Sequence, residues 1–344
     1  MNKNILIIGG AGFIGVNSAK YFLDKNCKVT IFDNFLRQGT RLNVDLLKKT
    51  YPQVKVIEGD IRYDFNKLKE LAEENEVFLH LAAQVAVTTS VKAPREDFEI
   101  NALGTFNVLE AVRQSAKHPI ILYSSTNKVY GGLESIEVVE GKERYDFKDL
   151  KKGVSESMCL DFHSPYGCSK GAADQYVHDY SRIYGLKTIV FRQSCIYGRH
   201  QFGVEDQGWV AWFLIAAIFG KPLTIYGNGK QVRDILFVDD LVRAYYLAID
   251  NFDKTSGQVY NIGGGYENTI SLLEFLDILK NELDFNLNYS FSDWRPGDQP
   301  IFVSDNSKIG KHINWKPEIN PIEGIKQLVE WLKEHKEIIE KFYI

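Results

Sequence analysis

Six short apolar segments, each separated from the next by an amphipathic stretch, most constrain what this chain can fold into. Strands that alternate with helices form a parallel sheet whose two faces are both covered. We therefore expect an α/β fold with a Rossmann-type, doubly wound parallel sheet. The predicted strands are residues 4–8, 28–32, 54–58, 76–81, 119–124 and 187–191, and the helical patterns between them are residues 12–25, 43–50, 64–74, 95–116 and 166–184.

After residue 192 the pattern changes to shorter helical segments between glycine-rich and aromatic-rich stretches. At about 150 residues per domain, 344 residues correspond to about two domains. We predict that residues 1–191 and 234–262 form the doubly wound domain. Residues 192–233 and 263–344 would form a smaller, discontinuous α/β domain that binds the substrate. Helices are expected there at residues 207–219, 239–250, 270–283, 305–312 and 321–336.

Charge and apolar content exclude several classes of protein. Lys plus Arg number 41 and Asp plus Glu 45, a net charge of −4, whereas a protein that wraps nucleic acid needs a basic surplus. The longest apolar run, residues 209–219, is far shorter than the roughly 20 residues that span a bilayer. The amino-terminal apolar run is too short for a signal peptide. The four cysteines lack the C-x-x-C spacing of a metal or redox motif, and the histidines are scattered along the chain. We expect a cytoplasmic protein with free thiols and without nucleic acid, membrane or metal partners.

A glycine-rich turn, GGAGFIG at residues 9–15, follows the first predicted strand and opens the first predicted helix. Its glycines let the backbone approach a pyrophosphate, whose charge then lies at the positive end of the helix. Asp33 ends the second strand, 21 residues after Gly12. A carboxylate there binds the ribose hydroxyls of NAD and repels the 2′-phosphate of NADP. Arg37 lies nearby, so NADP remains an alternative cofactor. The alternative for the glycines is a tight turn that packs the helix on the strand and binds no ligand.

Further positions at the carboxyl edge of the predicted sheet fit the same cofactor. Asp60 and Ile61 end the third strand, where a carboxylate can accept a hydrogen bond from the adenine amino group. The segment 81–84 (LAAQ) ends the fourth strand with small residues. Ligands of open α/β sheets bind at this edge.

Five tyrosines are followed by a lysine four residues later, a spacing that puts both side chains on one helix face. A lysine ammonium favours the phenolate, so we expect a lowered tyrosine pKa. Only Tyr166 opens a helix late in the sheet, 40 residues after a hydroxyl cluster that ends at Thr126. Core packing at a helix start is the alternative for Tyr166. The pairs are Tyr21/Lys25, Tyr51/Lys55, Tyr63/Lys67, Tyr166/Lys170 and Tyr226/Lys230.

Together these residues resemble the extended short-chain dehydrogenase/reductase family, which uses tightly bound NAD to remodel nucleotide sugars. The resemblance runs from about residue 4 to residue 335. Several stretches are most similar to family members that epimerise C2 of a CDP-sugar: LAAQVAVTTS (81–90), DFEIN (97–101), YSSTNKVYG (123–131), LDFHSPYGCSKGAADQYV (160–177), DQGWVAWF (206–213) and GNGKQVRD (227–234).

The resemblance implies a catalytic trio of Thr126, Tyr166 and Lys170, and Arg233 and Arg295 as diphosphate ligands. Either arginine could instead be a surface charge, and Tyr226 could stack on the nucleotide base or pack in the core. The predicted substrate-binding residues are Gln84, Thr126, Cys195, Gln201, Tyr226, Arg233 and Arg295. The predicted cofactor-binding residues are Gly9, Gly12, Phe13, Ile14, Gly15, Asp33, Asn34, Asp60, Ile61, Leu81, Ala82, Ala83, Gln84, Asn101, Ser124, Tyr166 and Lys170.

Two departures from the wider family bear on the reaction. Dehydratases of this fold carry Thr-Asp-Glu where this chain has Thr126-Asn127-Lys128. Dehydration needs a titrating acid and base, so this replacement disfavours it. Cys195 stands where many relatives have an asparagine that contacts the substrate, which puts that contact in doubt.

The resemblance and the motif positions predict epimerisation at C2 of a CDP-sugar by transient oxidation to a 2-ketone and return of hydride to its other face. Alternatives are CDP-glucose at C2, a UDP-sugar 4-epimerase, or a non-catalytic NAD-sensing protein. Gln84, Thr88, His163 and Gln201 would decide the sugar. Helices 95–116 and 166–184 are apolar enough to pair across a two-fold axis, so we expect a homodimer, with a homotetramer as the alternative.

Overall fold

The computed structural model describes residues 2–285, 287–295 and 298–343. Its largest element is a sheet of seven parallel strands in the order β12-β8-β5-β4-β1-β2-β3. The reversal of strand order next to β1 is the switch point at which doubly wound sheets bind ligands. The strands are β1 (Asn4–Ile8), β2 (Lys28–Asp33), β3 (Lys55–Glu58), β4 (Val77–His80), β5 (Ile120–Thr126), β8 (Thr188–Gln193) and β12 (Gln258–Ile262).

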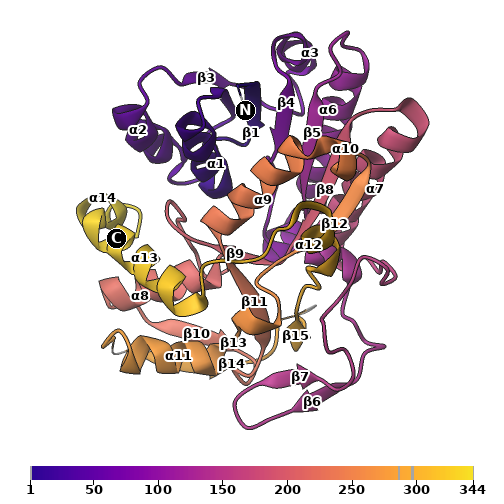
Figure 1. The fold of residues 1–344 in the computed structure, drawn as a ribbon. Helices are drawn as coiled ribbons and strands as arrows, with labels where there is room; N and C mark the ends of the chain where they lie inside the picture. The colour runs from indigo at the N-terminus through magenta and orange to yellow at the C-terminus, as the bar shows by residue number, and fades with distance from the viewer. Residues whose placement is uncertain (1, 286, 296–297, 344) are drawn as a thin grey trace.

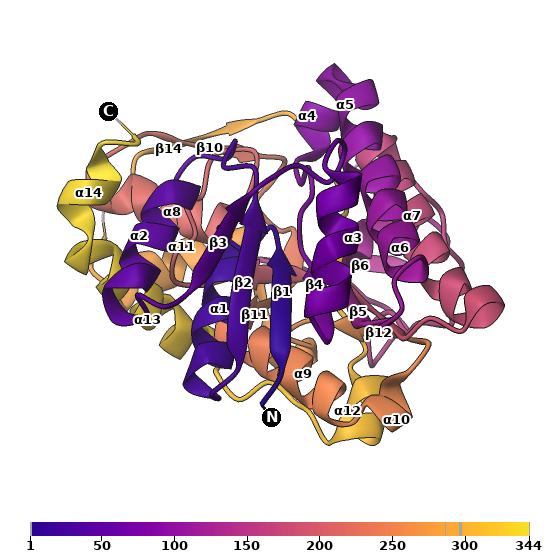
Figure 2. The same cartoon turned by 90° about the horizontal axis from the view of Figure 1, so that it is seen from above.

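Helices cover both faces of this sheet (Figure 2). α1 (Phe13–Asp24), α2 (Thr40–Thr50) and α9 (Val238–Asp250) pack on one face, where their apolar residues share a core with β1 and β2. α3 (Phe65–Glu74), α6 (Gly104–Arg113) and α7 (Ser164–Tyr184) pack on the other. Double coverage explains the nearly continuous apolar strands, since Ile5, Leu6, Ile7 and Ile8 of β1 are all fully buried.

A second group of strands and helices lies beside the carboxyl edge of the large sheet (Figure 1). β11 (Val232–Phe237) is its central strand, and it pairs with β13 (Thr269–Ser271), β15 (Ile301–Phe302) and β9 (Cys195–Tyr197). β10 (Leu223–Tyr226) pairs with β14 (Tyr289–Ser292). α8 (Trp209–Phe219), α11 (Leu272–Asn281) and α13 (Pro321–Glu334) pack on these strands in a common core.

All six predicted strands of the large sheet are confirmed, and β12 supplies a seventh. The chain therefore returns to this sheet within residues 234–262, as expected, but only through α9 and β12, because β11 lies in the other sheet. The assignment of residues to two domains remains a proposal. The short strands β9, β10, β13, β14 and β15 were not expected from the sequence.

The prediction of one continuous helix at residues 95–116 is wrong, because this segment is not a single α-helix. It consists of α5 (Pro94–Phe98), a π-helical turn (Glu99–Leu103) and α6. Such turns are frequent at functional sites. The remaining elements are α4 (Val87–Lys92), a 3₁₀ turn (Asn127–Tyr130), the hairpin β6 (Val138–Glu140) and β7 (Tyr145–Phe147), α10 (Phe252–Thr255), a 3₁₀ turn (Tyr266–Asn268), α12 (Ser307–Ile313) and α14 (Lys336–Glu340).

Among the described residues, no helix has both the length and the apolar character needed to cross a bilayer.

Candidate functional site

The glycine-rich turn joins β1 to α1 at the switch point of the sheet. Gly9 has a φ of +79°, and a Cβ on it would lie 2.6 Å from the backbone nitrogen of Ala82. A larger residue would therefore displace the loop after β4. Gly12 is the N-cap of α1, so the first N–H groups of this 12-residue helix face the turn without a covering side chain. This cradle fits a pyrophosphate.

Asp33 lies at the end of β2, directly beside the glycine-rich turn. Its carboxylate accepts hydrogen bonds from the backbone N–H groups of Ala11 (3.0 Å) and Phe35 (2.9 Å). Burial raises the pKa of this carboxyl, which these hydrogen bonds and the Arg37 guanidinium oppose. The carboxylate is thus fixed where the ribose of a dinucleotide would lie, which fits the predicted contact with NAD.

Asp60 lies at the end of the next strand and is engaged by the protein itself. Its carboxylate accepts hydrogen bonds from the Arg62 guanidinium (3.0 and 2.8 Å) and from the Asn34 amide (2.9 Å). Burial acts to raise its pKa, but these contacts bring it down to about 2. Asp60 therefore stays ionised, and a contact with adenine would have to share these oxygens.

The loop after β4 is held by a buried polar cluster that includes the predicted cofactor residues Gln84 and Asn101. The Asn101 side chain exchanges hydrogen bonds with the backbone of Gln84 (2.9 and 3.0 Å). Asp97 accepts from Gln84 (2.7 Å), Asn101 (3.1 Å) and Ser169 (2.5 Å). The Gln84 amide also bonds the backbone of Ala86, so its polar atoms orient this loop.

Asp97 and Ser169 were not predicted as site residues, although the word DFEIN contains Asp97. Asp97 and Asn101 both face the cluster because residues four positions apart share one face of a helix, and Asn101 lies within the π-helical turn. Asp97 is 1% exposed, and no alternation or helical periodicity indicates a buried carboxylate at that position.

Thr126, Tyr166 and Lys170 lie together, as the sequence predicted. Thr126 is the last residue of β5, and Tyr166 is in the first turn of α7, which packs against β5. Thr126 lies close enough to the Tyr166 hydroxyl to favour the ionised form of the phenol. The Lys170 ammonium donates to the backbone oxygen of Ser124 at 2.5 Å and lies 4.3 Å from the centroid of the Tyr123 ring. Thr126, Tyr166 and Lys170 are all buried.

The expected lowering of the Tyr166 pKa is wrong for this arrangement. Burial raises the pKa of Tyr166 to about 12, against the opposing effects of Thr126 and the Arg37 guanidinium. Burial also lowers the pKa of Lys170 to about 7, although Asp174 and Asp97 favour its charged form. The Lys170 ammonium donates to the Ser124 carbonyl. Desolvation is the largest influence on the pKa values of both Tyr166 and Lys170, and helical spacing does not reveal it.

Cys195 and Arg233 come from the second group of strands. β9, which begins at Cys195, pairs with β11, which carries Arg233. Burial raises the pKa of the Cys195 thiol to about 12, although the nearby Arg233 charge acts to lower it. The thiol is therefore neutral. Arg233 donates to the carboxylate of Asp298 at 2.6 Å. Arg233 is therefore ordered beside the candidate substrate site.

Arg295 and Tyr226, predicted to contact diphosphate and base respectively, contact each other. The Arg295 guanidinium lies 3.9 Å from the centroid of the Tyr226 ring and pairs with Asp206 (3.1 Å). The Tyr226 hydroxyl donates to Glu205 at 2.9 Å. A base could stack on Tyr226 only from the other face or after Arg295 moves. Gln201 is 6% exposed, and its Oε1 is buried without a hydrogen-bond partner among the described residues.

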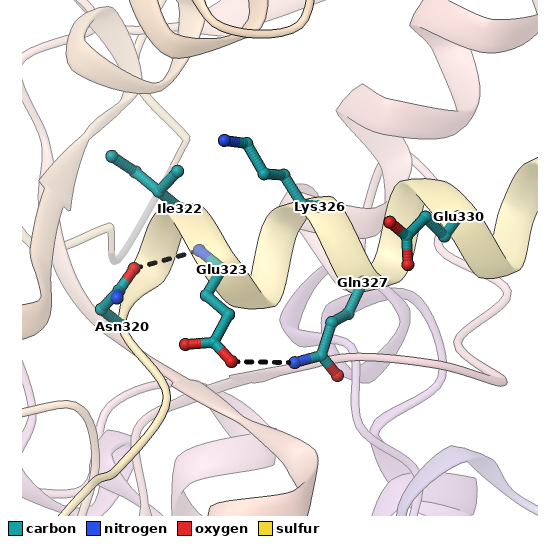
Figure 3. Close-up of a pocket in the computed structure, with 6 residues that line it drawn as sticks. All are labelled: Asn320, Ile322, Glu323, Lys326, Gln327 and Glu330. Carbon is teal, nitrogen blue, oxygen red and sulfur yellow. Dashed lines mark hydrogen bonds between the residues drawn. The ribbon is translucent and has the colours of Figure 1, made fainter.

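A surface hollow on α13 lies apart from this site (Figure 3). The polar side chains that line it bond one another: Asn320 accepts from the backbone N–H of Glu323 at 3.0 Å, and Gln327 donates to Glu323 at 3.4 Å. These contacts cap and stabilise the first turns of α13. The polar side chains that make them therefore have a structural role.

A doubly wound sheet with a glycine-rich turn at its switch point, a carboxylate at the end of β2 and a buried Thr-Tyr-Lys set is typical of a class of dinucleotide-dependent enzymes. Residues 5–263 match the model of the NAD dependent epimerase/dehydratase family, and the chain belongs to that family. NAD is accordingly its cofactor, as predicted.

Individual relatives agree with this assignment. The chain is 45% identical to CDP-paratose 2-epimerase of Salmonella typhi over 334 residues, which cover 95% of this chain and 98% of that protein. It is 32% identical to a putative UDP-glucose 4-epimerase of Methanocaldococcus jannaschii, covering 96% and 98%. The solved UDP-glucose 4-epimerase of Thermus thermophilus, in complex with NAD, matches with a TM-score of 0.80 and 30% identity, over 96% of this chain and 99% of that one.

Proposed function

We propose that this protein epimerises C2 of a CDP-sugar, converting CDP-paratose to CDP-tyvelose. The observation that carries the proposal is the buried set of Thr126, Tyr166 and Lys170 at the end of β5 and the start of α7, in a chain that is 45% identical to a CDP-paratose 2-epimerase along nearly its whole length. We assign the isomerase class to it on the same basis.

C2 of such a sugar has no adjacent carbonyl to acidify its hydrogen, so direct proton abstraction is unfavourable. When bound at Gly9, Gly12 and Asp33, NAD would supply a reversible hydride acceptor. Tyr166 would remove the proton of the C2 hydroxyl, with Thr126 fixing that hydroxyl by hydrogen bonding. Lys170 would favour the tyrosinate once a charged cofactor and a substrate reorganise this buried set. Return of a hydride to the other face of C2, together with return of the proton from Tyr166 to the oxygen, would complete the cycle without net redox change.

The 2-keto intermediate must turn over without leaving the enzyme. Anchoring of the diphosphate by Arg233 and Arg295, whose guanidinium groups suit bidentate contact with phosphate, would allow the sugar to turn while the nucleotide stays bound. Arg233 is 14% exposed, so part of it is accessible to a ligand. Cys195, neutral and beside Arg233, would pack against the substrate.

Dehydration is a poor alternative for this site. Asn127 cannot titrate, and Lys128 is not a carboxylate, whereas dehydration requires a proton donor and a proton acceptor at neighbouring carbons.

A second candidate activity is 4-epimerisation of a UDP-sugar. It is favoured by the 32% identity to a putative UDP-glucose 4-epimerase and by the match to the Thermus enzyme. The same Thr-Tyr-Lys set would serve a C4 hydroxyl, so the sugar orientation decides between the two.

The deciding experiment incubates the purified protein with CDP-paratose, CDP-glucose and UDP-glucose without added cofactor and identifies the products by chromatography and NMR. We expect CDP-tyvelose from CDP-paratose, with the NAD already bound to the protein. Conversion of UDP-glucose alone would identify the 4-epimerase instead. Unchanged sugars in every incubation, with NAD present, would indicate the NAD-sensing alternative.

We further propose that the protein acts in the cytoplasm as a homodimer, with residues 1–191 and 234–262 binding NAD and residues 192–233 and 263–344 binding the nucleotide sugar. The apolar side chains that α6 and α7 expose support the dimer.

A further inference from the structure

Lys128 has no role in the proposed mechanism, yet its side chain lies in the candidate substrate site. It belongs to the 3₁₀ turn that begins directly after Thr126, and its backbone N–H donates to the Thr126 hydroxyl at 3.3 Å. Its ammonium donates to Oε1 of Gln299 at 3.4 Å. Lys128 thus extends from the predicted reacting centre toward the loop that follows residue 297.

That loop connects Lys128 to Arg233. The backbone N–H of Gln299 donates to Oδ1 of Asp298 at 3.0 Å, and the same oxygen accepts from the Arg233 guanidinium at 2.6 Å. Gln299 is fully buried, and its amide also donates to the backbone oxygen of Gly131. Two cations from distant parts of the chain are therefore held around one carboxylate.

The charges of this cluster do not cancel. Burial and the Arg233 charge lower the pKa of Lys128 to about 8, against the opposing effect of Asp298. Near neutral pH the lysine still carries most of its charge, so two positive groups, Lys128 and Arg233, lie near the one carboxylate of Asp298 within the described part of this cluster. An anionic ligand that enters here would gain charge-assisted hydrogen bonds and relieve the repulsion between the cations.

We infer that Lys128 binds the phosphate that joins the sugar to the nucleotide, acting with Arg233 as a cationic pair around the diphosphate. This inference rests on the proposed function, because it takes a nucleoside diphosphate sugar as the substrate. Of the two phosphates, the sugar-linked one would lie nearest Thr126, and Lys128 is attached two residues beyond that threonine. Lys128 is a substrate-binding residue and takes no part in proton transfer.

The test measures binding of CDP and CMP by isothermal titration calorimetry. CMP lacks the second phosphate, so the comparison isolates the contact assigned to Lys128. The variants are Lys128→Met, which removes the charge, Lys128→Arg, which keeps it, and Lys142→Met as the matched control, since the Lys142 side chain is 94% exposed. Thermal unfolding verifies that each variant is folded. If Lys128→Met unfolds at a lower temperature than the wild type, Lys128→Gln replaces it.

We expect Lys128→Met to weaken CDP binding by about tenfold or more and CMP binding by less than about threefold. Lys128→Arg and Lys142→Met should bind CDP as the wild type does. Unchanged CDP affinity in Lys128→Met, or an equal loss for CDP and CMP, would overturn the inference. A wild-type protein that binds neither nucleotide would overturn the proposed function itself, a result distinct from either of these.

Discussion

Tyr166 shows how strongly burial controls the chemistry of a single residue. Thr126 favours the ionised form of its hydroxyl, yet desolvation raises its pKa to about 12. Lys170, four residues on, has its pKa lowered to about 7 by the same effect. Asp97 lies close enough to influence both groups and is itself fixed by Ser169 and Asn101. Burial, and the charges that enter with ligands, therefore set the proton affinity of this pair.

At the residue scale, we predict that Tyr166→Phe abolishes turnover of the CDP-sugar and leaves NAD bound. In the proposed mechanism the phenol supplies the proton transfer, which contributes about 100-fold or more to such reactions, whereas the glycine-rich turn and Asp33 would hold the cofactor. The measurement is product formation together with the NAD content of the denatured protein. Full activity in this variant would contradict the role of Tyr166, and loss of NAD would assign it to cofactor binding.

At the scale of elements, α7 is fixed to the sheet by a buried ion pair as well as by apolar packing. Asp174 of α7 accepts two hydrogen bonds from Arg192 of β8 (2.9 and 2.8 Å) and one from Ser125 of β5 (2.6 Å). The Asp174 and Arg192 side chains are 0% and 5% exposed. Because Tyr166 and Lys170 lie on the same helix, this contact also positions the end of α7 that carries the proposed catalytic residues.

We therefore predict that Asp174→Ala destabilises the protein by about 3–5 kcal/mol, since Arg192 would remain buried without its carboxylate. Asp179→Ala is the matched control on the same helix. Asp179 pairs with Arg182, but both side chains are about half exposed, so its loss should cost about 0–1 kcal/mol. Denaturant unfolding measures the loss of unfolding free energy in both variants. Equal losses would show that burial does not determine the contribution of the Asp174–Arg192 pair to stability.

At the scale of the whole molecule, α6 and α7 lie side by side (Figure 2), and these helices and the turn before α6 expose apolar and aromatic side chains. Phe106 and Tyr176 contact each other with ring centroids 5.9 Å apart. Contiguous apolar patches of this kind mark protein interfaces. The exposed residues are Phe98, Leu103, Phe106, Tyr176, Ile183 and Tyr184.

We predict that the double substitution Phe106→Asp and Tyr176→Asp converts a dimer into a monomer, because two charges on each subunit would meet across the two-fold axis. Light scattering coupled to size-exclusion chromatography measures the mass. Tyr63→Asp is the control, since Tyr63 is 73% exposed and lies outside these helices. A double variant that stays dimeric would place the interface elsewhere.

Most of the large sheet was predictable because its signals are local. Apolar runs, the glycine turn and Asp33 depend on a few consecutive residues, so the order of strands and helices through β8 followed from the sequence. The short strands around β11 were not predictable. Strands of two to four residues, such as β15 and β10, carry little periodicity and form through pairing with distant segments.

The sequence by itself indicated the glycine-rich turn and Asp33, and it placed Tyr166 and Lys170 of the Thr126, Tyr166 and Lys170 set on one helix face, because spacing within one strand or one helix defines which side chains share a face. Only the tertiary structure decided the proton affinities of that set, the buried Asp97 cluster and the contact of Lys128 with Gln299, which lies 171 positions away. These properties depend on desolvation and on charges from distant segments, and neither quantity exists until the chain has folded.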